Sequence, residues 1–255
     1  MGYLEDSNGK KLDIRKLCGD RLKHFNVMQG ACSDGVYIYV AFEQKKKKGR
    51  KHRIKIVKYQ VSPFKLVKIS GELNLGHAND MAYKNGILYV THSGKKKIIH
   101  RVDAKTLTKK KNIKPKIKVG TLKQRMKIKA FNGIAPYGNG LIIRPMGSST
   151  LLYCKDNNFV FTNVLKTSSP YRTSQGMDTD GHVVVRSFSW LQSSDKNHLV
   201  WYDKKGKEIK RMKVPVTGEM ECAFYVGRQL WVSVHRKIKK DGKLQFHAYL
   251  YRIGG

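Results

Sequence analysis

The stretch Thr173–Arg186 reads TSQGMDTDGHVVVR and joins an extended segment, a tight turn and a second strand. Its Asp180-Gly181 pair is typical of a two-residue hairpin turn, because both residues tolerate a positive φ angle. The β-branched run Val183–Val185 that follows favours a strand. A single hairpin does not define a fold, so the fold prediction depends on whether the hairpin recurs along the chain.

Four further stretches repeat this order of a polar residue, a small or apolar pair, a turn and an apolar strand. They are Met28–Val40 (MQGACSDGVYIYV), Ala78–Val90 (ANDMAYKNGILYV), Phe131–Ile143 (FNGIAPYGNGLII) and Met220–Val232 (MECAFYVGRQLWV). At the polar position, which we call the anchor, the five copies carry Gln29, Asn79, Asn132, Gln175 and Glu221. The anchors are 50, 53, 43 and 46 residues apart. A period of about 40 to 50 residues with several short strands per unit is typical of a β-propeller.

The repeat predicts an all-β fold, a five-bladed β-propeller that takes up residues 1–255 as one domain. The blades are placed approximately at 25–73, 75–118, 127–166, 172–215 and 218–255. The last blade lacks a fourth strand, because the chain ends soon after its third, Phe246–Ile253. We expect the N-terminal segment Lys10–Leu17 to supply that strand and close the ring, which leaves no long open sheet edge.

Charge is the strongest compositional signal. The chain has 52 Lys and Arg against 18 Asp and Glu, a formal net charge of +34. Such an excess attracts polyanions, and nucleic acid, teichoic acid, anionic lipid and acidic polysaccharide all qualify. Clusters of Lys and Arg in the loop 44–53, in Gly94–Lys97 and in the connection 105–129 suggest one basic face. Each cluster is either a solvated loop or a polyanion contact.

The cysteines and the N-terminus bear on the compartment. Cys18, Cys32, Cys154 and Cys222 form no C-x-x-C pair, so neither a zinc nor a redox motif is supported. Cys32 and Cys222 are expected to be buried thiols of inner strands, and a Cys18–Cys32 disulfide stays open. No apolar run approaches the roughly 20 residues that span a bilayer, and the N-terminus does not resemble a signal peptide. The chain is therefore either intracellular or a mature exported form whose leader has been removed.

The anchors predict a ring at one mouth of the central channel, because the first strand of each propeller blade lines that channel. The ring contains four amides and one carboxylate, Glu221. It can bind a small polar ligand, or a cation through oxygen atoms. Alternatively, it satisfies neighbouring backbone groups and channel waters. One carboxylate is too little charge for a typical calcium site, so we predict no metal site and leave the cofactor unknown.

Strand parity places further polar side chains at the same mouth. His77 and Glu219 each precede an anchor by two residues. The second strands end on His92, Arg144, Arg186 and His235, which complete the candidate ligand-binding wall. Histidine suits acid–base catalysis near neutral pH, although a lone histidine in a β-protein is commonly structural. No G-x-S-x-G, H-E-x-x-H or P-loop motif occurs, so catalytic residues stay unknown and enzymatic activity stays open.

Nucleic acid is an expected partner only in a non-specific sense. Lysine-rich loops can neutralise phosphates, and such binding falls steeply with salt. The chain contains no known nucleic-acid-binding module, and lysine outnumbers arginine, which favours loose attraction over specific readout.

Two C-terminal motifs carry a resemblance to a known family. Gln175–Gly181 (QGMDTDG), and Gly218–Ala223 (GEMECA) with Leu230–His235 (LWVSVH), resemble the helveticin J family of bacteriocin-like and lysin-like proteins from lactobacilli and related Gram-positive bacteria. The resemblance is clearest over residues 173–255, and elsewhere Gly76–Met81 (GHANDM) supports it. The lysine-rich insertions and the shorter chain depart from the family. The resemblance implies an exported or cell-wall-associated protein and transfers no catalytic residue.

Two main hypotheses follow. The first is an exported, cationic, monomeric propeller without a membrane span that binds anionic bacterial envelope polymers, such as teichoic acid, and is bacteriocin-like. The alternative is a metal-assisted hydrolase or lyase at the channel mouth that uses Glu221, Asn79, Asn132 and His77. Convergence of these four groups within coordination distance would favour the enzyme. A third hypothesis is a scaffold for protein partners.

Overall fold

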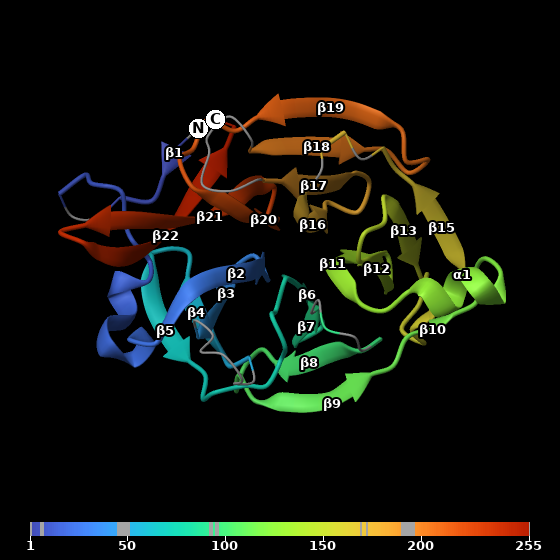
Figure 1. Cartoon of the computed structure of the whole chain (residues 1–255), viewed down its shortest axis with the longest axis horizontal. Coiled ribbons are helices and arrows are strands. Elements are labelled where there is room, and N and C mark those ends of the chain that lie inside the picture. Colours follow the sequence, from blue (N-terminus) through green and yellow to red (C-terminus); the bar gives the residue numbers. More distant parts are fainter. Residues whose placement is uncertain are drawn as a thin grey trace.

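The protein forms a ring of five antiparallel sheets around a central axis (Figure 1). The computed structural model describes residues 2–5, 8–44, 52–91, 94, 97–168, 170–171, 173–189 and 197–254. Each sheet has four strands, and in four blades the strands follow chain order from the axis outwards. The predicted five-bladed propeller is therefore confirmed.

The strands of the five blades have the following bounds. Blade 1 contains β2 (Phe25–Ser33), β3 (Tyr37–Gln44), β4 (Ile54–Gln60) and β5 (Lys65–Ile69). Blade 2 contains β6 (Asp80–Lys84), β7 (Ile87–Thr91), β8 (Ile99–Asp103) and β9 (Lys109–Ile113). Blade 3 contains β11 (Phe131–Tyr137), β12 (Gly140–Pro145), β13 (Thr150–Tyr153) and β15 (Asn163–Lys166). Blade 4 contains β16 (Ser174–Thr179), β17 (Val184–Phe188), β18 (His198–Tyr202) and β19 (Glu208–Lys213). Blade 5 contains β20 (Glu219–Val226), β21 (Gln229–Lys240), β22 (Lys243–Ile253) and β1 (Gly2–Tyr3).

The N-terminus closes the ring, but with a different segment from the predicted one. The strand that pairs with β22 is β1, in the register Gly2↔Arg252 and Tyr3↔Tyr251. Within the predicted segment 10–17, Lys11 pairs with Glu5 in an isolated bridge and Ile14 N–H donates to the Ala248 carbonyl. The chain doubles back at the Asn8-Gly9 turn, so its first arm takes the sheet edge and its second arm lies against the first.

The elements outside the blades are few and short. A 3-10 segment η1 (Lys16–Leu22) follows the N-terminal arm and buries Cys18 and Leu22. Between blades 2 and 3, β10 (Lys116–Ile117) pairs in parallel with β14 (Val160–Phe161). The helix α1 (Leu122–Lys127) has a capping box at its start and no buried residue. In the part of the chain that is described, no helix is long and apolar enough to cross a membrane.

The apolar core lies between neighbouring blades. One cluster joins blades 1 and 2, with Tyr39 from β3 packed against Met81 and Leu88, and similar clusters fill the other seams. All four cysteines are buried and free, so the Cys18–Cys32 disulfide is not formed. Each cluster draws its side chains from two neighbouring blades, so neighbouring blades bury their faces against each other.

Irregular pairing marks the anchor in the inner strands. The register shifts between Met28 and Ala31, and corresponding shifts surround the anchors Asn132, Gln175 and Glu221. In blade 2, Asn79 directly precedes β6 and follows Ala78, which has φ of 50°. A β-bulge changes the direction of the side chain at its site. The anchor therefore coincides with a repeated change of backbone direction at one level of the axis.

Candidate functional site

A carboxylate, Asp80, fills the axis just below the anchors. Its Oδ2 accepts backbone N–H bonds from Ile134 of blade 3 (2.9 Å) and Met177 of blade 4 (3.0 Å). Its Oδ1 accepts the N–H of Met81 at 3.0 Å and lies 3.4 Å from the Cys222 thiol of blade 5. Asp80 is fully buried, so one side chain ties four blades together.

Gly30 and Gly176 make room for Asp80, and small residues at this position were visible in the repeat. The residue after the anchor is glycine or cysteine in the other blades: Gly30, Gly133, Gly176 and Cys222. A Cβ built on Gly30 would lie 2.7 Å from the Asp80 Cα, and one on Gly176 would lie 2.7 Å from Asp80 Oδ1. Burial raises the pKa of Asp80, and its backbone hydrogen bonds oppose that shift. The single Asp among small residues at this position is a signal in the repeat that the choice of anchors did not include.

The anchors lie one residue further towards one mouth of the channel, which we call the anchor mouth. Gln29 and Glu221 are buried, and the other three anchors are half-buried. Gln175 Nε2 donates to Glu219 Oε1 at 3.2 Å. The Oδ1 atoms of Asn79 and Asn132 are shielded from solvent, and no described group hydrogen-bonds to them. The anchor mouth thus contains polar atoms that the surrounding protein leaves without partners.

The anchor mouth also gathers carboxyl groups. Burial raises the pKa of Glu221, the nearby carboxylates of Glu219 and Glu43 raise it further, and Lys237 opposes the shift. Glu221 itself is nearly inaccessible to solvent. Three carboxyl groups at one end of the axis are unexpected in a chain of net charge +34.

Two histidines lie against Glu43, near the end of β3. His77 Nδ1 is 2.6 Å from Glu43 Oε2, and His52 Nδ1 contacts Glu43 Oε1. The two imidazole rings meet edge to face, with centroids 5.7 Å apart. Glu43, His52 and His77 bring their ligand atoms within 4.8 Å of one another, a group suited to a metal ion. Of the four groups predicted to converge, only His77 belongs to this set.

Arg144 and Arg186 do not wall an open pocket as expected. Both are buried. Arg144 donates to the carbonyls of Asn132, Ser174 and Gln175, which joins blade 3 to blade 4. Arg186 donates to Thr167 Oγ1 at 2.7 Å. Burial lowers the pKa of Arg144 to about 9. These guanidinium groups hold a seam between blades, so we leave them out of the candidate site.

His235 has a comparable structural role between blades 5 and 1. It is fully buried, and its Nδ1 faces the Met28 N–H at 3.4 Å. Burial, with Lys237 and Arg15 nearby, lowers its pKa to about 3, so the ring is neutral and accepts that hydrogen bond. The remaining predicted wall residue, His92, lies outside the described residues.

Glu43 could have been predicted by the same rule that singled out His235. His235 pairs with Glu219, two residues before an anchor, and Glu43 pairs with Val27, also two residues before an anchor. The two side chains therefore occupy equivalent positions of blades 5 and 1. His52 gave no such signal, because it lies in a lysine-rich loop whose path the repeat does not specify.

The opposite mouth contains a pocket. It has a volume of about 250 Å³ and is lined in part by Asp34, Tyr83, Asp178 and Tyr225. Asp178 accepts the N–H groups of Tyr225 (2.8 Å) and Thr179 (2.9 Å). Burial raises the pKa of Asp178 to about 7. This carboxyl closes the lower end of the axis.

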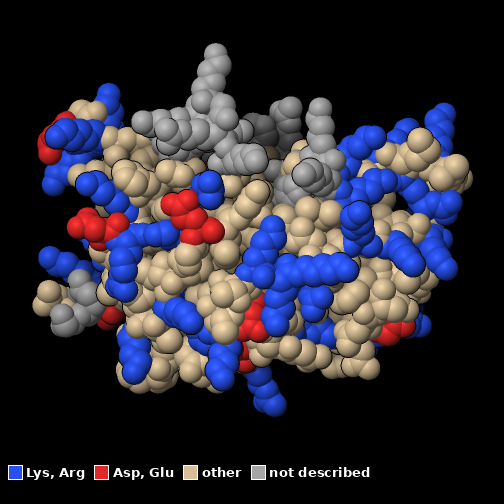
Figure 2. All heavy atoms as spheres, turned by 90° about the horizontal axis from the view of Figure 1, so that it is seen from below, with Lys and Arg blue, Asp and Glu red and all other residues tan. Residues whose placement is uncertain are grey.

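Lysine and arginine spread over the outer side of blades 1 to 3, as Figure 2 shows, with acidic residues between them mainly over blade 1. From Lys105 to Lys155 the sequence contains no Asp or Glu. Exposed lysines of this stretch include Lys109, Lys110, Lys111, Lys114, Lys116, Lys118, Lys123, Lys127 and Lys129. We call this surface the basic wall.

A groove of about 470 Å³ beside α1 belongs to the basic wall. Its floor includes Val119, Met146 and Leu152, and its rim carries Lys127 and Lys166. The groove therefore combines an apolar surface with cationic edges.

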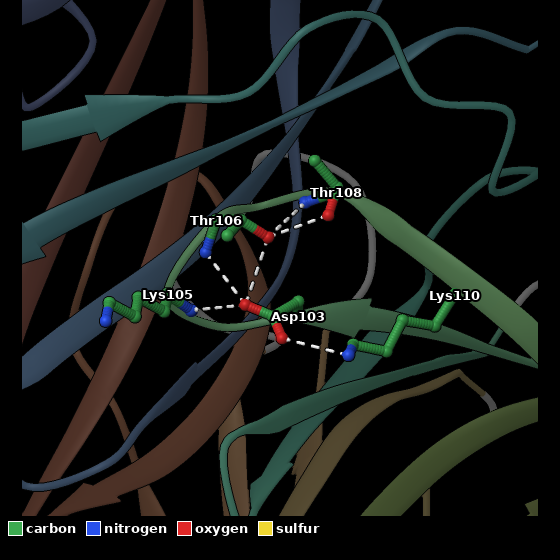
Figure 3. Close-up of polar contacts among 5 residues, drawn as sticks. All are labelled: Asp103, Lys105, Thr106, Thr108 and Lys110. Carbon is green, nitrogen blue, oxygen red and sulfur yellow. Dashed lines mark hydrogen bonds and ion pairs between the residues drawn. The ribbon is translucent and has the colours of Figure 1, made fainter.

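The acid nearest to the basic wall in sequence serves a turn. Asp103 ends β8, and its Oδ1 accepts the backbone N–H groups of Lys105 and Thr106 (Figure 3). Its Oδ2 forms an ion pair with Lys110 at 3.1 Å. These hydrogen bonds and the ion pair hold the pKa of Asp103 well below its usual range. Asp103 neutralises one lysine and leaves the rest of the basic wall unbalanced.

Comparison with known proteins identifies the architecture only. No family model and no curated protein matches this chain. Among solved structures, the glutaminyl cyclase of Myxococcus xanthus has a TM-score of 0.58 at 10% identity, covering 91% of this chain and 93% of that one. The hydrazine synthase of Kuenenia stuttgartiensis has a TM-score of 0.41 at 14% identity, covering 82% and 55%. The likeness to the cyclase supports the propeller fold and carries no activity across.

Proposed function

We propose that this protein binds a polyanion through its basic wall. The observation that carries the proposal is the run of exposed lysines on β9, β10 and α1 without a single acid from residue 104 to 155. Each lysine is a solvated point charge on a flexible stem, which suits a repeating phosphate or carboxylate polymer better than one shaped ligand. The binding energy comes mainly from releasing counterions of the polymer.

The proposed target is an anionic polymer of the bacterial envelope, such as teichoic acid, met by an exported form of the protein. The net charge of +34 and the motif resemblance over residues 173–255 support this choice. The groove beside α1 adds an apolar surface against which a polymer backbone can pack between the cationic edges. A bacteriocin-like effect on a target cell would follow from binding at that surface.

Sedimentation with purified cell walls tests the proposal. We expect binding to walls that contain teichoic acid, strong weakening when salt is raised, and little binding to walls stripped of that polymer. A triple variant, Lys111→Gln/Lys114→Gln/Lys116→Gln, should reduce the slope of log affinity against log salt by about 2 to 3 if each lysine meets one anionic group. The matched control, Lys204→Gln/Lys205→Gln/Lys207→Gln in the exposed β18–β19 turn, removes equal charge from blade 4.

Three results would contradict the proposal. Binding that does not change with salt excludes an electrostatic polymer contact. Equal losses in the two triple variants place the contact outside the basic wall. Equal binding to nucleic acid, heparin and stripped walls retains polyanion binding but excludes a specific envelope target.

The alternative function is a metal-assisted hydrolase or lyase at the anchor mouth. The grouping of Glu43, His52 and His77, together with the nearby carboxyl of Glu221, favours keeping it. Release of product from small ester, peptide or glycoside probes, with loss in a Glu221→Gln variant, would support it. No release with any of these probes would leave binding as the function of the protein.

A further inference from the structure

The strongest unexplained cluster of side chains is Glu43, His52 and His77 at the anchor mouth. Polyanion binding makes no use of it, because two imidazoles around a carboxylate do not attract an anionic polymer. Glu43 is held near the end of β3 and its side chain is only 7% exposed. His52 and His77 have about one third of their side chains exposed, so the cluster is reachable from solvent.

Regular backbone pairing positions all three residues. The Gln44 N–H donates to the Arg53 carbonyl at 2.9 Å, which fixes the segment next to His52 against the end of β3. His77 stands two residues before Asn79, whose N–H donates to the Thr91 carbonyl at 3.1 Å. Glu43 lies on a strand, and His52 and His77 lie in segments whose neighbours hydrogen-bond to strand ends, which constrains their arrangement.

The contacts within the cluster are not fully satisfied by hydrogen bonds. His77 Nδ1 is shielded from solvent and, within the described chain, makes no hydrogen bond, although Glu43 Oε2 is 2.6 Å away. The relative orientation of ring and carboxylate is therefore unsuitable for a hydrogen bond. A cation placed between the three groups would take the Glu43 carboxylate and both imidazole nitrogens as ligands.

The chemistry of the donor atoms selects the kind of ion. Two imidazole nitrogens and one carboxylate oxygen match the ligands of zinc and its first-row neighbours, whereas calcium and magnesium prefer oxygen ligands alone. Ligand atoms about 2.0–2.1 Å from a tetrahedral ion lie about 3.3 Å from one another. The three ligand atoms already lie within 4.8 Å of one another, so small side-chain rotations suffice.

We propose that Glu43, His52 and His77 form a binding site for a divalent transition-metal ion of the zinc class. Three protein ligands would leave the fourth position of a tetrahedral ion for water or a ligand atom. Glu219, two residues before the anchor Glu221, adds a further carboxyl group to the same mouth. The proposed metal site is independent of polyanion binding, whereas the alternative enzymatic function would depend on this metal site.

Calorimetric titration of metal-stripped protein, prepared without a polyhistidine tag, tests the site. We expect one zinc ion to bind with micromolar affinity or better, and calcium and magnesium to bind far more weakly. Cobalt added in place of zinc should give the visible absorption typical of tetrahedral coordination. Glu43→Gln, His52→Gln and His77→Gln should each weaken zinc binding by about 100-fold or more, since even residues that only support metal ligands change affinity by 10–100-fold.

Controls separate this site from adventitious binding. His24 and His182 are exposed and lie in other parts of the sequence, so the His24→Ala/His182→Ala variant should bind zinc like the parent protein. The Lys111→Gln/Lys114→Gln/Lys116→Gln variant should also retain zinc binding, even where it loses the polymer. Circular dichroism of each variant confirms folding, and the cobalt spectrum of the parent protein stands without any variant. Absence of zinc binding by the parent, or unchanged binding in the His52 and His77 variants, would overturn the proposal.

Discussion

Near the axis, Glu43, Asp80, Asp178, Glu219 and Glu221 bring together five of the 18 acidic residues of the chain, whereas the basic wall carries lysines with almost no acid. The acids near the axis are buried or half-buried and lie among backbone N–H groups, imidazoles or one another. The lysines of the wall stand in solvent. The chain thus places its scarce acidic residues at the sheltered axis and its abundant lysines on an exposed surface.

Substitutions at the axis and on the wall should therefore affect different properties. A buried carboxylate has lost its water, so every hydrogen bond that replaces the water contributes to the free energy of unfolding. An exposed lysine keeps its water and contributes to long-range attraction, which salt screens. We therefore expect axis variants to change stability and wall variants to change binding, and the following four predictions test that division.

The largest effect is expected for Asp80→Ala. The change leaves the N–H groups of Met81, Ile134 and Met177 without their acceptor, at a cost of about 1–3 kcal/mol each. Urea denaturation followed by circular dichroism should show a loss of at least about 3 kcal/mol. Asp80→Asn keeps one acceptor oxygen and should lose less. A loss below about 1 kcal/mol for Asp80→Ala would break the view of Asp80 as the hub of the ring.

Gly176→Ala should give the next largest effect. Its added Cβ would meet Asp80 Oδ1 and the Cys222 sulfur, each at 2.7 Å. Crowding of this kind costs about 1–3 kcal/mol. The matched control is Gly71→Ala, because no atom lies within 4 Å of the Cβ position at Gly71. Equal unfolding midpoints for the two variants would show that the axis accommodates the added methyl group without strain.

Asp178 should make the stability of the axis depend on pH. Its pKa is raised from 3.8 to about 7 in the folded protein, so the folded state holds a proton that the unfolded state releases. Its contribution to stability is therefore full below pH 4 and is lost as pH rises to about 7. Partial exposure of the side chain limits the change to about 2 kcal/mol. The parent protein should lose stability relative to Asp178→Asn as pH rises from about 4 to about 7. Urea midpoints at several pH values would measure this difference. A pH-independent difference would contradict this assignment.

The smallest effect on stability is expected for Lys111→Gln/Lys114→Gln/Lys116→Gln. Exposed substitutions away from caps and buried partners change the free energy of unfolding by about 0.5 kcal/mol or less. Reduced self-repulsion should favour the variant slightly at low salt. Thermal unfolding at low and high salt would measure this. A decrease of more than about 2 kcal/mol in the free energy of unfolding would mean that the wall lysines have a structural role, which would contradict the division between wall and axis.

The sequence predicted the ring because its signals are local and repeated. Each blade needs an extended inner strand, a turn such as Asp180-Gly181 and a second apolar strand, and all of these are short-range requirements. Closure by the N-terminus was predictable from the missing fourth strand of the last blade. The identity of the closing segment was not, because the Asn8-Gly9 turn presents two arms and only contacts with β22 select Gly2–Tyr3.

The candidate site was less predictable, because its members come from positions that the repeat does not relate. Asp80 was within reach, since the aligned copies show glycine or cysteine at the other four positions. Glu43 was within reach through its pairing position on the second strand. His52 was not, because charged loops follow paths set by tertiary contacts. Side-chain chemistry placed three further residues in the predicted wall, Arg144, Arg186 and His235. Their burial between blades gives them a structural role instead.

The hub at Asp80 has a consequence for how the protein can come apart. A linear array of repeats can fray from its ends, because each repeat depends only on its neighbours. Here blades 3, 4 and 5 all contact one side chain of blade 2, and β1 fastens the two ends of the chain. A single peptide-bond cut in an outer loop leaves every one of these contacts in place. The nicked protein should therefore stay assembled and unfold in one cooperative step.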